Sequence, residues 1–399
     1  MDSGKREVYE PDTRRALDLV IKLMAIPGRS GDEAGVAGFI ERRLREAGAP
    51  AAAVRRDAAH RRTPVGGNTG NLVLRLRGTR RAPRRMLSAH MDTVPICLGA
   101  RPVLRGKQIH SADPSTGLGA DDRAGVAVVL ATALEILTRR LPHPPLTFCW
   151  FVQEEVGLHG SRRVTKSLLG RPRLAFNWDG GSPYKVTIGA TGSYRLTIEV
   201  KGVAAHAGVA PESGVSAIAI ASLAIADLER SGWHGQIRKG GRLGTSNVGT
   251  IHGGETTNVV ADRVVMRAEA RSHDPFFRKR IVREIERAFA RAAREVKSAS
   301  GARGRVSVQR QLDYESFRLR DDDPCIEIAE RAVRSLGCEP ERAVANGGID
   351  ANWTNRHGIP TVSLGCGQVA PHTTREALDV ERFREACRIA LRLATATES

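Results

Sequence analysis

Apolar residues recur along the first half of the chain in two kinds of pattern. Helical spacing over 13–25 and 31–47, and an Ala/Val-rich run over 122–137, predict three helices. Shorter apolar runs predict strands over 71–76, 85–89 and 146–152. The third of these is apolar enough for a buried, parallel position. Strands that alternate with helices favour an α/β fold with three layers around a mixed sheet.

After Gly192 the pattern changes to strand, helix, strand, strand, helix, strand, the order of a ferredoxin-like βαββαβ unit. The predicted segments are 194–200, 215–230, 245–251, 258–271, 275–297 and 305–310. Later segments, the helix 322–336, the strand 361–364 and the helix 380–394, return to the α/β pattern. We therefore expect one domain in two parts, 1–190 and 312–399, with a second domain, 191–311, inserted between them.

The length of 399 residues suits two domains, and six scattered cysteines without a CxxC pair indicate free thiols. No apolar run is long enough to span a membrane, and the segment Met1–Pro11 is charged. These features predict a cytoplasmic protein with no membrane partner.

The formal net charge of +18 comes mostly from arginine and allows two interpretations. One is nucleic-acid binding, and the other is arginine at solvent-facing positions without a specific partner. The basic residues are dispersed and few aromatic residues accompany them, so we favour the second and expect no nucleic-acid partner. Steering of anionic substrates remains compatible with the charge.

Acidic and imidazole side chains follow the ends of apolar runs. His90 and Asp92 share one face of a strand end, where Asp92 can orient the imidazole of a metal-bound His90. Asp121 and Asp122 lie at a loop-to-helix junction, so Asp122 can cap the helix or point outward while Asp121 bridges two metals. Taken singly, each motif is also explained by an ordinary cap or polar turn.

The pair Glu154-Glu155 ends the apolar strand 146–152, and two acids gain nothing from that setting. One carboxylate can bind a metal while the other acts as a general base. Asp179 precedes two glycines, and His372 lies in a Gly-rich loop, where functional side chains are often displayed. Five such positions in order predict a metal-dependent hydrolase.

These motifs resemble the di-zinc metallopeptidases that include peptidase T, carboxypeptidase G and aminoacylase, and most closely the peptidase T-like branch. The resemblance covers nearly the whole length and rests on the segments 88–94, 119–125, 154–157, 177–181, 347–352 and 371–374. Arg123 stands where most members have Lys, and Gln153 where many differ, but neither departure removes a ligand.

The resemblance implies two Zn²⁺ ions per subunit, for which Co²⁺ or Mn²⁺ could substitute. Asp121 would bridge both ions, His90 and Asp179 would complete one site, and Glu155 and His372 the other. Glu154 would be the general base, with Asp92 beside His90. An Asp at position 179 is typical of aminopeptidases and dipeptidases in this family.

The inserted domain resembles the family's lid, through which many members form homodimers. The segment 202–208 is similar to the one whose histidine, here His206, stabilises the oxyanion. Asn258 and Arg271 match positions that hold the substrate's carboxylate or carbonyl. The sequence alone is explained equally well if His206 is an ordinary loop residue and Arg271 is a surface charge.

We expect a di-zinc metallopeptidase that cleaves the N-terminal peptide bond of di- or tripeptides with a metal-activated water. The alternative is an amidohydrolase that removes acyl or carbamoyl groups from amino acids on the same scaffold. A third possibility, from another class, is a basic nucleic-acid-binding protein whose acid clusters are incidental.

Overall fold

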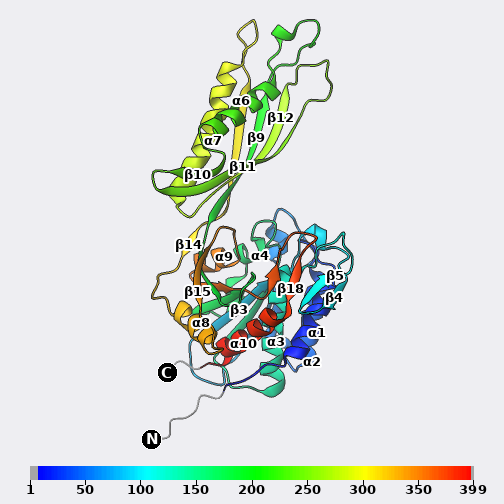
Figure 1. The fold of residues 1–399 in the computed structure, drawn as a ribbon, viewed down its shortest axis with the longest axis vertical. Coiled ribbons are helices and arrows are strands. Elements are labelled where there is room, and N and C mark those ends of the chain that lie inside the picture. Colours follow the sequence, from blue (N-terminus) through cyan, green and yellow to red (C-terminus); the bar gives the residue numbers. More distant parts are fainter. Residues whose placement is uncertain (1–7, 397–399) are drawn as a thin grey trace. The chain divides into compact units, whose positions relative to one another are not determined.

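The computed structural model describes residues 8–396, and most of the charged segment at the start of the chain lies outside this range. Contacts divide the chain into two compact units (Figure 1). The first contains residues up to Gly189, Arg318–Ala345 and the segment from Ile349, and the second contains Ala190–Phe317 and Asn346–Gly348. Among the described helices, none is long and apolar enough to cross a bilayer.

The first unit is built on a nine-stranded sheet in the order β1-β2-β6-β3-β7-β16-β8-β14, with β15 paired to β8. Its strands are β1 Val54–Arg56, β2 Leu72–Leu76, β3 Arg85–His90, β6 Leu146–Phe151, β7 Leu174–Trp178, β8 Lys185–Ala190, β14 Phe317–Arg318, β15 Glu341–Ala345 and β16 Thr361–Leu364. The central strands β6, β3, β7 and β16 are parallel. Every residue of β3, β6, β7 and β16 is buried, because layers cover both faces of the sheet.

The sheet is mixed, as predicted, but the direction expected for strand β6 is only partly right. Strand β6 was expected to be parallel to its neighbours, but it is parallel only to β3 and antiparallel to β2. Its apolar composition reflects burial on both faces rather than strand direction. An apolar run therefore predicts that a strand is buried, but it does not predict whether each neighbouring strand is parallel or antiparallel to it.

Helices cover both faces of this sheet, which confirms the three-layer α/β architecture. On one face α3 (Ala120–Arg139) packs against β3, α1 and α10, and the Trp150 indole donates to the Val126 carbonyl at 3.4 Å. On the other face Met86 and Phe151 pack with Val164 and Leu169. The remaining helices are α1 Thr13–Met24, α2 Ala34–Glu46, α4 His159–Arg162, α5 Lys166–Leu169, α8 Pro324–Arg334, α9 Ala351–Arg356 and α10 Val380–Thr395.

A second, four-stranded sheet in this unit has the order β17-β18-β5-β4 and was not predicted. Its strands are β4 Pro102–Arg105, β5 Gln108–Ser111, β17 Gln368–Val369 and β18 Ala377–Asp379. They are two to four residues long, too short for a periodic signal. The sheet joins the segment after the first acid cluster to the loop that carries His372.

The second unit has one five-stranded antiparallel sheet in the order β10-β11-β12-β9-β13. Its elements are β9 Gly192–Lys201, α6 Ala217–Arg230, β10 Gly235–Lys239, β11 Arg242–Gly253, β12 Arg263–Ser272, α7 Pro275–Glu295 and β13 Arg305–Tyr314. Without β10, the order is that of a ferredoxin-like unit. Strand β10 is an addition at the edge, and Asn258, expected in a strand, lies in the loop before β12.

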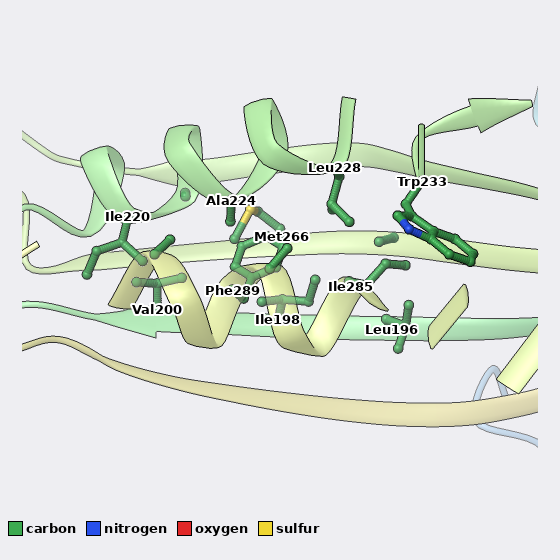
Figure 2. Close-up of a cluster of buried hydrophobic side chains, with 14 of the residues drawn as sticks. Leu196, Ile198, Val200, Ile220, Ala224, Leu228, Trp233, Met266, Ile285 and Phe289 are labelled. Atoms are coloured by element: carbon green, nitrogen blue, oxygen red, sulfur yellow. The ribbon is translucent and has the colours of Figure 1, made fainter. Parts of the chain in front are cut away.

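The core of the second unit lies between the sheet and its two helices. Figure 2 shows Ile198 and Met266 of the sheet packed under Ala224 of α6 and Phe289 of α7. Alternate residues of β9 and β12 are buried, since one face of the sheet meets the helices and the other does not.

Candidate metal centre

Three parallel strands deliver the predicted site residues to one edge of the main sheet. His90 ends β3, Glu154 follows β6, and Asp179 follows β7. In the register, His90 pairs with Phe151 and Ser88 with Asn177, so these strands end side by side. Carboxyl ends of parallel strands meet at one edge, where ligand sites form in α/β sheets.

His90 is buried and faces a carboxylate with each ring nitrogen. Its Nε2 lies 3.3 Å from Asp121 Oδ1, and its Nδ1 lies 3.1 Å from the Asp92 carbonyl oxygen and 3.4 Å from Asp92 Oδ1. With Nδ1 held as a donor, Nε2 points at the acid cluster. This is the geometry of a metal-binding imidazole oriented by a carboxylate behind it.

Asp92 is fully buried and also fixes the acid pair. Its Oδ1 accepts from the Glu154 amide at 2.9 Å, and its Oδ2 accepts from the Glu155 amide at 3.2 Å. The Ser30 hydroxyl donates to Oδ2 at 2.6 Å. One carboxylate therefore positions His90, Glu154 and Glu155 relative to each other.

The two aspartates at the start of α3 have different environments, and the peptide bond between them is cis. Asp122 is buried and accepts from the Gly125 amide at 3.0 Å and from the His90 amide at 3.2 Å. It caps the following helical turn, so the expectation that it could instead point outward is wrong. Asp121 lies between His90 and His372, and His372 Nε2 is 3.2 Å from Asp121 Oδ2.

His372 completes the cluster from the loop after β17. Its Nε2 lies 3.0 Å from the Glu155 carboxylate, and its backbone has a positive φ of 63°. Potential ligand atoms of His90, Asp121 and Glu155 lie within 4.8 Å of one another, as do those of Asp121, Asp122 and Asp179. Asp121 belongs to both groups, as expected for a residue between two ions.

The electrostatics of the cluster fit a divalent metal. Burial raises the pKa of Asp179 to about 7, helped by the charge of Asp121. Burial also raises the pKa of Glu155, and it raises that of Glu154 well above its ordinary value. So many carboxylates in one buried place disfavour ionisation, and a cation removes that penalty.

The two imidazoles supply positive charge to the metal-free cluster. Hydrogen bonds to Asp121 and Glu155 raise the pKa of His372 to about 10. Burial opposes protonation of His90, but Asp121 and Asp92 raise its pKa well above the ordinary value. Burial likewise acts to raise the pKa of Asp121, yet the two histidines lower it. The surrounding carboxylates thus favour protonated imidazoles where metal charge would act.

Two buried glutamates support the site and were missed in the sequence. Glu376 accepts from the amides of Leu118, Gly119 and Asp121 at 2.9, 2.8 and 3.0 Å, and so fixes the start of α3. Glu33 accepts from the Gln153 amide at 3.0 Å, directly before Glu154. No motif marks either residue, because both bind backbone groups far away in the sequence.

Two further buried residues, Asp350 and Arg123, interact electrostatically with residues of the cluster. Asp350, from the segment 347–352 that carried part of the resemblance, is 1% exposed, and burial raises its pKa to about 7. The Arg123 side chain is buried and donates to the Gly28 carbonyl at 3.1 Å. Burial lowers the pKa of Arg123 to about 10, although the charges of Asp92 and Glu33 raise it.

The other three predicted residues lie in the second unit. His206 and Asn258 are exposed neighbours: the Ala207 amide donates to the Asn258 carbonyl at 2.9 Å, and His206 Nδ1 accepts from the Gly208 amide at 3.2 Å. Arg271, on β12, binds Glu269 with Nε at 2.9 Å and Nη2 at 2.8 Å. Its guanidinium is thus already paired with a carboxylate of its own unit.

Comparison with known proteins agrees with this site. Residues 86–396 match the model of peptidase family M20/M25/M40. The uncharacterized protein YqjE of Bacillus subtilis is 31% identical over 373 residues, which cover 93% of this chain and 95% of that protein.

Two solved structures are similar over almost their whole length. A tripeptidase of Staphylococcus aureus has a TM-score of 0.86 at 30% identity, covering 97% of this chain and 99% of that one. Aminopeptidase PepT of Bacillus cereus has a TM-score of 0.82 at 30% identity, covering 96% and 98%. The resemblance inferred from the motifs is confirmed. The chain belongs to peptidase family M20/M25/M40 and is a metallopeptidase of its peptidase T-like branch.

Proposed function

We propose that this metallopeptidase is an aminopeptidase that releases the N-terminal residue of di- or tripeptides. The observation that carries the proposal is the position of Glu154, a buried residue whose backbone amide donates to Asp92 and whose carboxylate lies close enough to Glu155 and Asp179 to feel their charge. The similarity to a tripeptidase and to an aminopeptidase at 30% identity supports this substrate class.

Five side chains would hold two divalent ions, as zinc or as Co²⁺ or Mn²⁺. His90 and Asp179 would bind one, Glu155 and His372 the other, and Asp121 would bridge them. When bound, the ions would polarise the peptide carbonyl and lower the pKa of a water towards about 7. Imidazole and carboxylate ligands without cysteine are compatible with all three metals.

Glu154 would accept the proton of the attacking water and deliver it to the leaving amine. A base must stand near the water without being held by a metal, and it is Glu155, not Glu154, that contacts His372 and shares a group of clustered ligand atoms with His90 and Asp121. Burial keeps the proton affinity of Glu154 high, as proton delivery to an amine requires. Asp92 would act through its hydrogen bonds to the acid pair and to His90.

Residues of the second unit would complete substrate binding. His206 would stabilise the oxyanion, and Asn258 and Arg271 would hold the substrate's carboxylate or carbonyl. For Arg271 this requires that the substrate carboxylate replaces Glu269. Both carboxylates would accept two hydrogen bonds from the same guanidinium group. The second unit would also serve as lid and as the homodimer interface, and a cytoplasmic location remains a prediction.

A substrate panel tests the proposed specificity. Tripeptides, dipeptides, N-acetyl amino acids and N-carbamoyl amino acids are compared at equal concentration with the metal-loaded protein. We expect hydrolysis of the peptides with a free amino terminus and little turnover of the others. Preferential hydrolysis of N-acyl or N-carbamoyl amino acids would instead establish the amidohydrolase alternative.

A further inference from the structure

A cavity lies in the first unit, at the other end of the main sheet from the acid cluster. Its volume is about 680 Å³, within the range of sites for small organic ligands. It is lined by the end of β2, the loop after it, the segment 48–53 and the C-terminal end of α3.

Four arginines line this cavity, and its lining contains no acidic residue: Arg75, Arg77, Arg84 and Arg140. Within residues 8–396, none of the four forms an ion pair. At another arginine pair of the same unit, Arg388 and Arg392 bind Glu10. This cavity therefore gathers positive charge without a counterion.

Two of these like charges are brought together closely. A Cβ added to Gly170 would lie 2.8 Å from Arg75 Cδ and 3.1 Å from Arg84 Nε, so both side chains pass the same glycine. Arg84 is held in place, because its Nη1 donates to the carbonyls of Leu76 at 3.1 Å and Leu146 at 2.5 Å. Burial, and secondly the charge of Arg75, lowers the pKa of Arg84.

Apart from Thr79 and His143, the rest of the lining is apolar or glycine. Ile136 and Leu141 are buried, and Leu76 and Ala53 lie beside them. The C-terminal end of α3 adds a partial negative charge of about −0.5, which four guanidinium groups outweigh. The cavity thus has a strongly cationic side and an apolar side.

We propose that this cavity binds an organic phosphate with at least two phosphoryl groups and an apolar or aromatic part. Guanidinium groups match phosphate oxygens in bidentate geometry, and several of them favour a ligand of multiple charge. The volume exceeds what inorganic phosphate fills, and the apolar wall provides contact for the organic part.

The cavity is separate from the metal centre, so the proposal does not depend on the peptidase activity. Leu76 and Leu146 pair at the cavity end of the sheet, whereas His90 and Phe151 pair at the metal end. Six residues of β3 separate the two ends, a distance of roughly 17 Å.

Calorimetric titration of the metal-loaded protein with ADP tests the proposal, using inorganic pyrophosphate and adenosine as partial ligands. The variant R75Q/R77Q/R140Q removes three exposed charges and leaves Arg84 in place for folding. Its control, R42Q/R105Q/R356Q, removes three exposed arginines elsewhere in the same unit. Thermal unfolding of both variants checks that they remain folded.

We expect ADP to bind one site per chain, with roughly hundredfold weaker binding in the cavity variant and unchanged binding in the control. Pyrophosphate should bind more weakly than ADP, and adenosine not measurably. Equal losses in both variants, or no binding to the unmodified protein, would overturn the proposal. If pyrophosphate bound as tightly as ADP, the claim that the apolar wall contacts an organic group would be overturned. If adenosine bound as tightly as ADP, the claim that the arginines bind the phosphoryl groups would be overturned.

Discussion

Adjacent glutamates can take different chemical roles when one buried aspartate holds both of their amides. Asp92 fixes the backbone of Glu154 and Glu155 through one carboxylate oxygen each. Glu155 then lies 3.0 Å from His372, within the ligand cluster, while Glu154 is buried beside it with a strongly raised pKa. The division between ligand and base in the proposed mechanism follows from this arrangement.

Glu154→Gln should therefore abolish turnover without loss of metal. Gln has almost the same shape but cannot accept the proton, so we expect the rate to fall by about 10²–10⁴-fold. The matched variant Glu155→Gln should lower metal content instead. Elemental analysis and peptide hydrolysis, measured on the same preparations, separate the two effects. A Glu154→Gln enzyme with near-normal rate would contradict the assignment of the base.

Glu33 should make stability depend on pH. Burial, and then the charge of Asp92, raises its pKa from 4.5 to about 7, so the folded state binds its proton more tightly than the unfolded state. The contribution of Glu33 to the free energy of unfolding should fall by roughly 3 kcal/mol as pH rises from 4.5 through 7, and this part of the loss should be absent in Glu33→Gln.

Denaturant unfolding of both proteins at pH 5 and pH 8 measures this difference. Glu33→Gln should gain stability relative to the unmodified protein at pH 8. The control Glu46→Gln, whose side chain is 59% exposed at the end of the same helix, should show no such gain. An equal difference at both pH values would refute the role given to the Glu33 carboxyl.

The sequence predicts the site residues at strand ends better than the buried glutamates whose hydrogen bonds hold the backbone around them. His90, Glu154 and Asp179 each follow an apolar run, and apolar runs predict buried strands. Glu376 lies 255 residues from Asp121, whose amide it binds, and Glu33 lies 120 residues from Gln153. Bonds of this kind depend on the folded backbone, and no local pattern encodes them.

At the scale of elements, the first turn of α3 is fixed from outside the helix. The Glu376 carboxylate accepts from the amides of Leu118 and Gly119, directly before the helix, and of Asp121 in its first turn, where helices leave amides without partners. Asp121 depends on this anchor for its position between His90 and His372.

Glu376→Ala should lower both stability and metal affinity. Three buried amides would lose their acceptor, which we expect to cost about 3 kcal/mol of unfolding free energy. Denaturant unfolding and metal titration check both effects. Glu327→Ala, which removes an exposed acid paired at 3.6 Å with Arg331, is the control and should change stability by less than about 0.5 kcal/mol. Unchanged metal binding in Glu376→Ala would show that the anchor is dispensable.

Most buried elements were predictable to within a few residues, including the four-residue strand β16, and short strands at sheet edges were not. The predicted helix 275–297 is α7, Pro275–Glu295, whose buried positions recur at helical spacing. Strand β10, by contrast, lies at an edge and buries only Ile237, so it lacks the alternating pattern of β9 and β12. Burial gives an element its periodic signature, and edge strands have little of it.

At the scale of the whole molecule, metal binding is coupled to protons. In the metal-free protein the pKa of His372 is about 10, so its imidazole carries a proton at pH 7.5, and the pKa values of His90, Glu155 and Asp179 are also raised. A metal needs neutral imidazoles and ionised carboxylates, and we therefore expect the release of at least one proton per chain on loading and tighter binding as pH rises. Calorimetry in buffers of different ionisation enthalpy measures the release, and metal uptake without proton release would contradict this electrostatic description.

The most direct test of the account is tripeptide hydrolysis as a function of metal content. The protein is freed of metal with a chelator and dialysed, and zinc is then returned in steps while the rate and the bound metal are measured together. We predict no hydrolysis without metal and a rate that rises until two ions are bound per chain. Full activity in the metal-free protein would contradict the central claim.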